Sequence, residues 1–464
     1  MSKPAALAPV QDPPARLAEL LAEVRAGRPL PSADHEVLDH YIAIAERCSE
    51  GRDWSAVAEA IVSAELVDRG FRFHHMSGDA ACRHDELLLG DYCLVCAAEL
   101  ATRMGRSDVD LEFARAAMAA ALGDDYQAHL ERAVETAVTP GEKRPVLLTA
   151  DAPGPLDSAA VLGVIEARMR DIVAADPPVV AGPMGAMLEA GGKRLRPQLA
   201  FLASTLGTQH DPSRASTLAC VIEFIHNATL VHDDLVDDSP LRRGMPATHV
   251  SFGAQAAVRV GDYYFGRAAA LLASLENADS TRLVVVAVAL VCQAQIEEFS
   301  SRGMDHLDEA RYLKIVEGKT AALFSGACAA GAALSSAGPR VVQAMADYAK
   351  NLGIAFQMVD DVLDFSPTSG KTLVQDLRQS VGLPLVYAGE DPAIRQGLAN
   401  LLLEDDFDAE AAVRLVQESG ALERTMARAA EFRDRALQAL EAIPDGPARD
   451  RFREIAVLAV ARTS

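Results

Sequence analysis

Apolar positions recur along most of this chain at the three- and four-residue spacing of an amphipathic helix. The pattern runs from Leu17 to about Val138, where short breaks containing Gly, Asp or Ser separate the helical segments. It resumes after about residue 155, and its breaks fall at proline sites: Asp176-Pro177-Pro178, Ser239-Pro240, Gly338-Pro339 and Ser366-Pro367. No series of segments alternates as strands do. The sequence therefore predicts an all-α fold.

Proline and glycine gather between the two helical regions, at Thr139-Pro140-Gly141 and again at residues 151–155. Such clusters are typical of a connection between domains. We predict a flexible lead over residues 1–15, an N-terminal helical domain over 16–138, a linker over 139–155 and a second helical domain over 156–464.

A short sequence repeat, or echo, occurs in both regions. Leu89-Gly90-Asp91-Tyr92 and Val260-Gly261-Asp262-Tyr263 each open an alanine-rich helical stretch. The match is short enough to arise by chance. It also suggests that the N-terminal region is a degenerate copy of the C-terminal one.

Charge and cysteine content narrow the function classes. A net charge of −22 argues against general binding to nucleic acid or to anionic membranes, which both need a basic surface. The seven scattered cysteines fit a reducing cytoplasm. Residues 1–11 lack the order of a secretory signal, and the longest apolar run, Leu283–Cys292, is too short to span a bilayer. We expect a cytoplasmic protein.

Two aspartate clusters share one spacing. Asp233, Asp234 and Asp237 lie at i, i+1 and i+4, and so do Asp360, Asp361 and Asp364. This spacing puts the carboxylates together on one side of a helix, where like charges repel unless a cation offsets them. Either cluster alone could be a solvated helix end. Two of them at the ends of apolar helices predict a carboxylate cage for Mg²⁺ and a diphosphate.

Isolated cations accompany the carboxylates. They lie in Gly191–Pro197, Arg242-Arg243-Gly244, Gly318-Lys319-Thr320 and Gly370-Lys371-Thr372. Arginine and lysine beside turns suit phosphate oxygens, the first through bidentate hydrogen bonds and the second as a point charge. Together they predict pockets for phosphate groups.

These motifs, with the stretch from His226 to His232 and Phe356–Asp364, resemble in order and spacing those of the polyprenyl diphosphate synthase family, over residues from about 155 to 464. The resemblance implies an isoprenoid-synthase helical bundle, usually a homodimer, with several Mg²⁺ ions per active site. It also implies condensation of isopentenyl diphosphate with an allylic diphosphate.

The resemblance assigns a role to each motif residue. The Mg²⁺ ligands would be Asp233, Asp234, Asp237, Asp360, Asp361 and Asp364. The allylic diphosphate would contact Arg242, Lys319 and Lys371, and isopentenyl diphosphate would contact Lys193, Arg196, His226 and Arg243. Thr320 and Gln357 would lie against the reacting carbons.

The chain departs from the family pattern in two places. Residues 376–384 are one residue shorter and lack a lysine, and Ala294-Gln295-Ile296-Glu297-Glu298 replaces a Gly-Glu…Gln stretch. These changes affect the expected closure of the site around the diphosphate and not the class of reaction.

The resemblance implies that product length depends on side chains one turn before Asp233. In short-chain members of the family an aromatic residue blocks that level, whereas Ala228 and Thr229 are small. One helical turn spans ~5.4 Å, close to one isoprene unit. We expect a long product of about six to ten units, or C30–C50, with Phe224 as a deeper floor or as plain core.

The N-terminal region lacks both aspartate motifs and weakly resembles the noncatalytic small subunit of two-component heptaprenyl diphosphate synthases. An alternative for this region is a zinc site at Cys82, His84, Cys93 and Cys96. Because cysteine is also a common small buried residue, core packing is the favoured interpretation.

The C-terminal region is compatible with other functions. A class I terpene cyclase shares the fold and one aspartate motif, but it binds one diphosphate and does not need Lys193, Arg196 and Arg243 together. A short-chain geranylgeranyl or farnesyl diphosphate synthase is a second alternative, and a silent subunit a third. Peripheral membrane contact during product release is a further expectation.

Overall fold

The computed structural model describes residues 54–76, 84–138, 158–300, 308–365, 382–403 and 409–461, together with residues 22, 37 and 40–43. In these ranges the regular structure is helical except for two two-residue strands. Strand β1 (Leu241–Arg242) pairs antiparallel with β2 (Met245–Pro246), with Leu241 opposite Pro246. The all-α prediction is confirmed.

The described helices lie on both sides of the predicted linker. In chain order they are α3 (Trp54–Met76), α4 (His84–Arg103), α5 (Ser107–Leu122), α6 (Gln127–Val138), α7 (Ser158–Ala174), α8 (Pro178–Glu189), α9 (Leu195–Ala203), α10 (Pro212–Val236), α11 (Thr248–Phe252), α12 (Ala254–Ser274), α13 (Ala278–Ser300), α14 (Glu309–Val316), α15 (Ala322–Leu334), α16 (Pro339–Leu363), α18 (Leu383–Ala388), α19 (Pro392–Leu403), α20 (Ala409–Glu418), α21 (Ala421–Ala439) and α22 (Pro447–Val460). Short 3-10 turns lie at Ser204–Leu206 and Leu440–Ala442, and a π-helical turn, η3, at Glu317–Ala321.

Proline and aspartate set several helix starts. Pro178 and Pro339 begin α8 and α16, as their breaks in the pattern predicted, because proline is pre-shaped for the first helical turn. The Asp211 side chain accepts hydrogen bonds from the backbone N–H groups of Ser213 and Arg214, at 2.9 and 3.3 Å, and so caps α10. The predicted break at Ser366-Pro367 lies outside the described residues.

Three hydrophobic cores hold the helices together. The largest contains side chains of α3–α6 together with side chains of α7, α10, α12, α13 and α15. The second joins α14 and α16 to α18–α21, and the third joins α9, α15 and α16 to α21 and α22. The helices before and after the predicted linker therefore share one core, while residues 139–155 themselves lie outside the described ranges.

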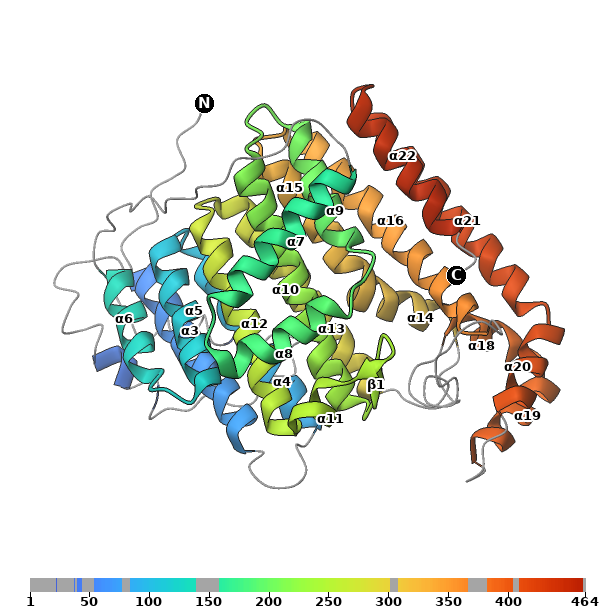
Figure 1. Cartoon of the computed structure of the whole chain (residues 1–464), viewed down its shortest axis with the longest axis horizontal. Coiled ribbons are helices and arrows are strands. Elements are labelled where there is room, and N and C mark those ends of the chain that lie inside the picture. Colours follow the sequence, from blue (N-terminus) through green and yellow to red (C-terminus); the bar gives the residue numbers. More distant parts are fainter. Residues whose placement is uncertain are drawn as a thin grey trace.

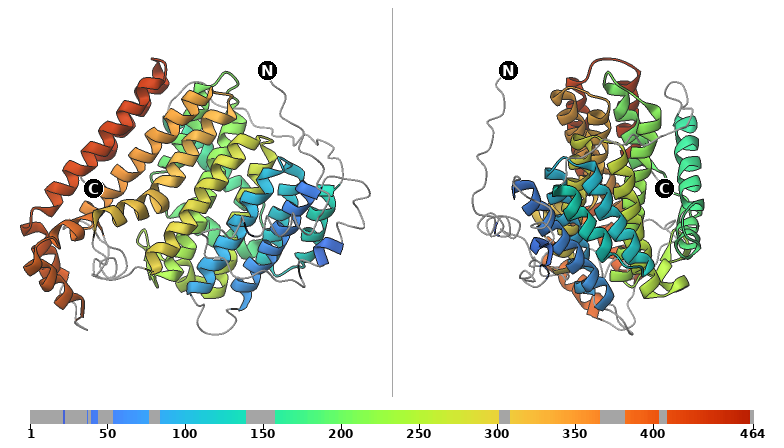
Figure 2. Two further views of the ribbon diagram at one scale, coloured as in Figure 1. Left: turned by 180° about the vertical axis from the view of Figure 1, so that it is seen from behind. Right: turned by 90° about the vertical axis from the view of Figure 1, so that its left-hand side faces the viewer.

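The N-terminal helices lie along one side of the molecule, opposite to α19–α22 (Figures 1 and 2). There α5 packs against α12, and α4 packs against α13. Among the described residues no helix combines the length and apolar character needed to cross a membrane.

Candidate active site

The first aspartate cluster lies at the C-terminal end of α10. Asp233 and Asp234 occupy its last turn, and Asp237 follows as the C-cap residue. The Asp234 side chain is only 3% exposed and pairs with Arg242, which returns from β1: the Nε atom of Arg242 lies 2.9 and 3.1 Å from the two carboxylate oxygens. Burial raises the pKa of Asp234, and Arg242 opposes that effect.

The π-helical turn η3 brings a lysine to this cluster. Lys319 Nζ lies 3.2 Å from Asp233 and 2.5 Å from Glu298 of α13. Burial alone would raise the pKa of Asp233, but Lys319 and Arg242 hold it below its usual value. Gly318 allows the approach, because a Cβ atom there would lie 2.5 Å from the Cβ of Ala294 on α13. Single π turns are frequent at functional sites.

The next residue of η3 reaches the second cluster. Thr320 Oγ1 donates to Gln357 at 2.9 Å, and Gln357 Nε2 donates to Asp361 at 2.9 Å. Consecutive residues of one turn thus connect to both aspartate clusters, Lys319 directly and Thr320 through Gln357.

Asp361 is held by protein donors on both oxygens. Besides Gln357, the Tyr312 hydroxyl donates to it at 2.6 Å and the Leu383 backbone N–H at 3.0 Å. Burial raises the pKa of Asp361 to about 6, against the effect of these donors. Asp360 and Asp364, at the end of α16, are more exposed than Asp361.

A group of cations lies at the turn before α9. Arg196 Nη1 lies 3.3 Å from His226 Nε2, and its guanidinium lies 4.3 Å from the centre of the Phe324 ring. Burial, followed by the nearby Arg196 and Arg243, holds the pKa of His226 well below its usual value, so this imidazole is neutral and accepts from Arg196. Arg243 donates to the backbone carbonyl of Gly191. Three of the four residues predicted to hold isopentenyl diphosphate therefore gather in one place.

The remaining basic residues of this turn have different environments. Lys193 is exposed, whereas Arg194 turns inward and forms a buried ion pair with Glu223 of α10. Burial also lowers the pKa of Arg196 to about 10, and Asp360 opposes that effect, so the cation group lies near the second aspartate cluster.

Several predicted positions are less informative. Lys371 and residues 366–381 lie outside the described ranges. Ala228 and Phe224 are fully buried in the largest core, where Phe224 lies 5.5 Å from the Tyr264 ring, and Thr229 is half-buried. Cys93 and Cys96 are buried along α4, while Cys82 and the side chain of His84 are outside the described part.

Sequence reasoning assigned no role to four residues that complete the site. They are Gln295, which donates to Asp233, and Glu298, Tyr312 and Glu223. Gln295 and Glu298 were visible only as a departure from the family pattern. Tyr312 and Glu223 carry no motif, and only tertiary packing identifies them.

Comparison with known proteins agrees with this geometry. The sequence model described as polyprenyl synthetase matches residues 177–419. Heptaprenyl diphosphate synthase component 2 of Geobacillus stearothermophilus is 34% identical over 285 residues, which are 60% of this chain and 89% of that protein. Octaprenyl diphosphate synthase of Escherichia coli is 34% identical over 290 residues, 60% of this chain and 88% of that protein.

A solved structure gives the same result for the fold. The polyprenyl synthase of Caulobacter crescentus, crystallised with calcium and isoprenyl diphosphate, superposes with a TM-score of 0.62 at 32% identity, over 66% of this chain and 96% of that one. The matched family region begins at residue 177, after the N-terminal helices α3–α6. This chain belongs to the polyprenyl synthetase family and is a polyprenyl diphosphate synthase, an enzyme that transfers prenyl groups.

Proposed function

We propose that this enzyme condenses isopentenyl diphosphate with an allylic diphosphate, repeatedly, to give a long-chain product of about C30–C50. The observation that carries the proposal is the position of η3 between the two aspartate clusters. Lys319 contacts the first cluster, and Thr320 begins the chain of hydrogen bonds, through Gln357, that ends at Asp361 of the second. The named relatives, a heptaprenyl and an octaprenyl synthase, support the long product.

The donor set fits magnesium. Carboxylate oxygens are the ligands that Mg²⁺ prefers, usually together with substrate phosphates. We therefore propose that all six motif aspartates, Asp233, Asp234, Asp237, Asp360, Asp361 and Asp364, would hold the ions. Arg242 orients Asp234, and Tyr312 and the Leu383 backbone N–H orient Asp361. When bound, the ions would neutralise charge on the departing diphosphate.

The chain's own residues supply the rest of the chemistry. Lys319 and Arg242 remain cationic in the site, since Asp233 and Asp234 respectively raise the pKa of each against the effect of burial, and both can bind the allylic diphosphate together with Lys371. Such preplaced charges favour ionisation of the allylic C–O bond. Thr320 and Gln357 would lie beside the cation that forms, and the isopentenyl double bond attacks it from the neighbouring pocket. The new cation then loses a proton from the adjacent carbon to the departing diphosphate, which leaves the double bond of the lengthened product.

The pocket for isopentenyl diphosphate is assigned to Lys193, Arg196, His226 and Arg243. Arg243→Ala and Lys193→Ala should raise the KM for isopentenyl diphosphate about 10-fold or more, because each removes a charge-assisted phosphate contact. The KM for the allylic substrate should change little. Steady-state kinetics with each substrate varied in turn will measure both, and the reverse pattern would mean that the two pockets are exchanged.

Product length can be tested at the turn before Asp233. Thr229 is half-buried and lies four residues before Asp233, on the same helix face, so we expect Thr229→Phe to shorten the product at a similar rate of first condensation. Ala228→Phe is the matched comparison. Ala228 is 0% exposed, so unless it borders the elongation cavity a phenylalanine there overpacks the core and costs ~1–3 kcal/mol. Chromatography of dephosphorylated products beside a thermal melt separates the outcomes, and an unchanged long product from both stable variants would place the floor elsewhere.

The reaction itself is tested directly. Purified protein is incubated with labelled isopentenyl diphosphate, Mg²⁺ and each allylic starter in turn, and the dephosphorylated products are separated by chromatography. We expect elongation of at least one starter to long products. Release of diphosphate with a cyclised hydrocarbon, and no use of isopentenyl diphosphate, would contradict the proposal and favour a terpene cyclase.

A further inference from the structure

A buried cluster of two histidines and two aspartates lies between the N-terminal helices and the rest of the enzyme. His74 of α3 is 2.8 Å from Asp262 of α12 through Nδ1, and its Nε2 is 3.2 Å from the carbonyl of Leu87. His232 of α10 is 2.9 Å from Asp91 of α4 through Nδ1, and its Nε2 is 3.1 Å from the carbonyl of Val258. Each imidazole thus makes the same two contacts, and each aspartate belongs to the opposite half of the molecule.

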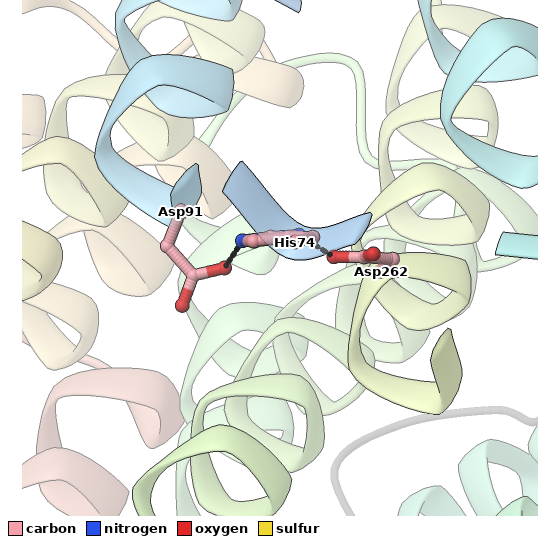
Figure 3. Close-up of side chains that lie close together, drawn as sticks. All are labelled: His74, Asp91 and Asp262. Atoms are coloured by element: carbon pink, nitrogen blue, oxygen red, sulfur yellow. Dashed lines mark ion pairs between the residues drawn. The ribbon is translucent and has the colours of Figure 1, made fainter. Parts of the chain in front are cut away.

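A metal site does not explain this cluster. Figure 3 shows Asp91 and Asp262 at opposite edges of the His74 ring, against different nitrogens. One atom of each of these three residues lies within 4.8 Å of the others, but each carboxylate contacts its own ring nitrogen, which is the arrangement of two ion pairs. Although burial opposes it, Asp262 holds the pKa of His74 above its usual value, as expected for an ion pair. The cluster is a contact between two halves.

The two halves correspond at several key positions. On α3 a buried Glu65 precedes His74 by nine positions, and on α10 a buried Glu223 precedes His232 by nine. The echo supplies the next helix of each half: Leu87, Gly90 and Asp91 of α4 match Val258, Gly261 and Asp262 of α12.

Helix boundaries extend the match. α4 ends at Arg103 and α5 begins at Ser107, while α12 ends at Ser274 and α13 begins at Ala278, so both connections are three residues long.

Close packing of glycine against histidine recurs in both halves. A Cβ atom at Gly90 would lie 2.2 Å from the His74 ring, and one at Gly261 would lie 2.0 Å from the His232 ring. Only glycine lets α4 and α12 approach their own histidines this closely. The helix contacts between the two halves are also reciprocal: α5 of the first half packs against α12 of the second, and α4 of the first packs against α13 of the second.

Exchange of contacts between equivalent elements is the signature of an isologous twofold pair. In place of the homodimer that the resemblance implies, we propose that α3–α5 are an internal, degenerate second subunit, docked on α10, α12 and α13 of the same chain. The enzyme is then a monomer with one active site, because its own N-terminal helices occupy the face that a second copy would use.

The internal subunit lacks the residues that would bind metal and diphosphate. Where α10 carries Asp233 and Asp234, the equivalent positions of α3 are His75 and Met76. Only seven residues separate α3 from α4, whereas seventeen, including Arg242 and Arg243, separate α10 from α12. It retains the docking residues and lacks those of the diphosphate site.

Sedimentation of the full chain tests the proposal without reference to activity. We expect the mass of one chain over a wide range of concentrations. A stable dimer at low concentration would overturn the proposed monomer.

A disulfide across the pseudo-twofold tests how the helices dock. An ideal Cβ at Gly266 of α12 lies 3.0 Å from the Cβ of Ala117 of α5 and 2.9 Å from the flexible side chain of Met118. The two Cβ atoms must move apart by about 0.5–0.8 Å to allow an Ala117→Cys/Gly266→Cys bond. Under oxidising conditions the bond should form within one chain, which keeps the mass of a monomer on a non-reducing gel. The control is Ala117→Cys/Gly163→Cys, because Gly163 has no atom within 4 Å and should not be linked, and each single variant reveals bonds made by the natural cysteines. A bond between two chains would mean exchange of the N-terminal helices between copies, and no bond would mean that α5 does not dock on α12; either result overturns the proposal.

Discussion

Replacing Asp233 or Asp360 with alanine is expected to lower the rate of condensation by at least about 100-fold while leaving the helices folded. Each change removes one carboxylate from the proposed magnesium ligands, and Asp233→Ala also leaves Lys319 with Glu298 as its remaining close partner. Charge that develops on the diphosphate then has less compensation when the allylic bond breaks. Single-turnover assays at saturating Mg²⁺ and both substrates will measure the chemical step.

A carboxylate far from the site provides the control for this prediction. Asp445 pairs with Arg449 and its side chain is 92% exposed, so Asp445→Ala should leave turnover unchanged. Circular dichroism of all three variants should show the same helix content. Turnover near that of the unaltered enzyme in a folded Asp360→Ala protein would remove the proposed metal cage.

The buried ion pair behind the cation pocket should have the largest effect on stability. The side chains of Arg194 and Glu223 are 1% and 3% exposed, so Glu223→Leu leaves the guanidinium buried, with the Leu188 carbonyl at 2.9 Å as its hydrogen-bond acceptor among the described residues. Removing one partner of a buried pair costs about 3–5 kcal/mol. Thermal and urea unfolding of the full chain will measure the loss.

Replacing both partners separates the pair from the packing around it. Arg194→Met/Glu223→Leu removes both charges of the pair, and we expect it to recover most of the stability lost in Glu223→Leu. The internal subunit offers a milder comparison, Glu65→Leu, since Arg69 is 13% exposed and can reach water. Equal losses in the single and the double variants would show that Glu223 acts through shape and not through charge.

The sequence predicted the helical fold and the two aspartate clusters because both are written in local patterns. Helix periodicity depends on residues three and four apart, and each Asp motif lies within five consecutive positions. Proline positions correctly marked the starts of α8 and α16.

Contacts between distant segments could not be predicted in this way. Arg194 stands between Lys193 and Arg196 in the sequence, yet only the position of Glu223 on α10 shows that Arg194 is structural. Tyr312 reaches Asp361 from a helix 49 positions earlier in the chain. The four-residue echo around Asp91 was visible in the sequence, but its meaning depends on His74 and His232, which no local pattern selects.

The internal pairing also changes how the enzyme responds to dilution. Two separate subunits part when their concentration falls below the dissociation constant, whereas a tethered partner keeps a local concentration of about millimolar whatever the amount of enzyme present. The contact between Asp91 and His232, the residue before Asp233, is therefore kept at any enzyme concentration. Specific activity should stay constant down to the most dilute assay, and a single gene product carries both the working subunit and its support.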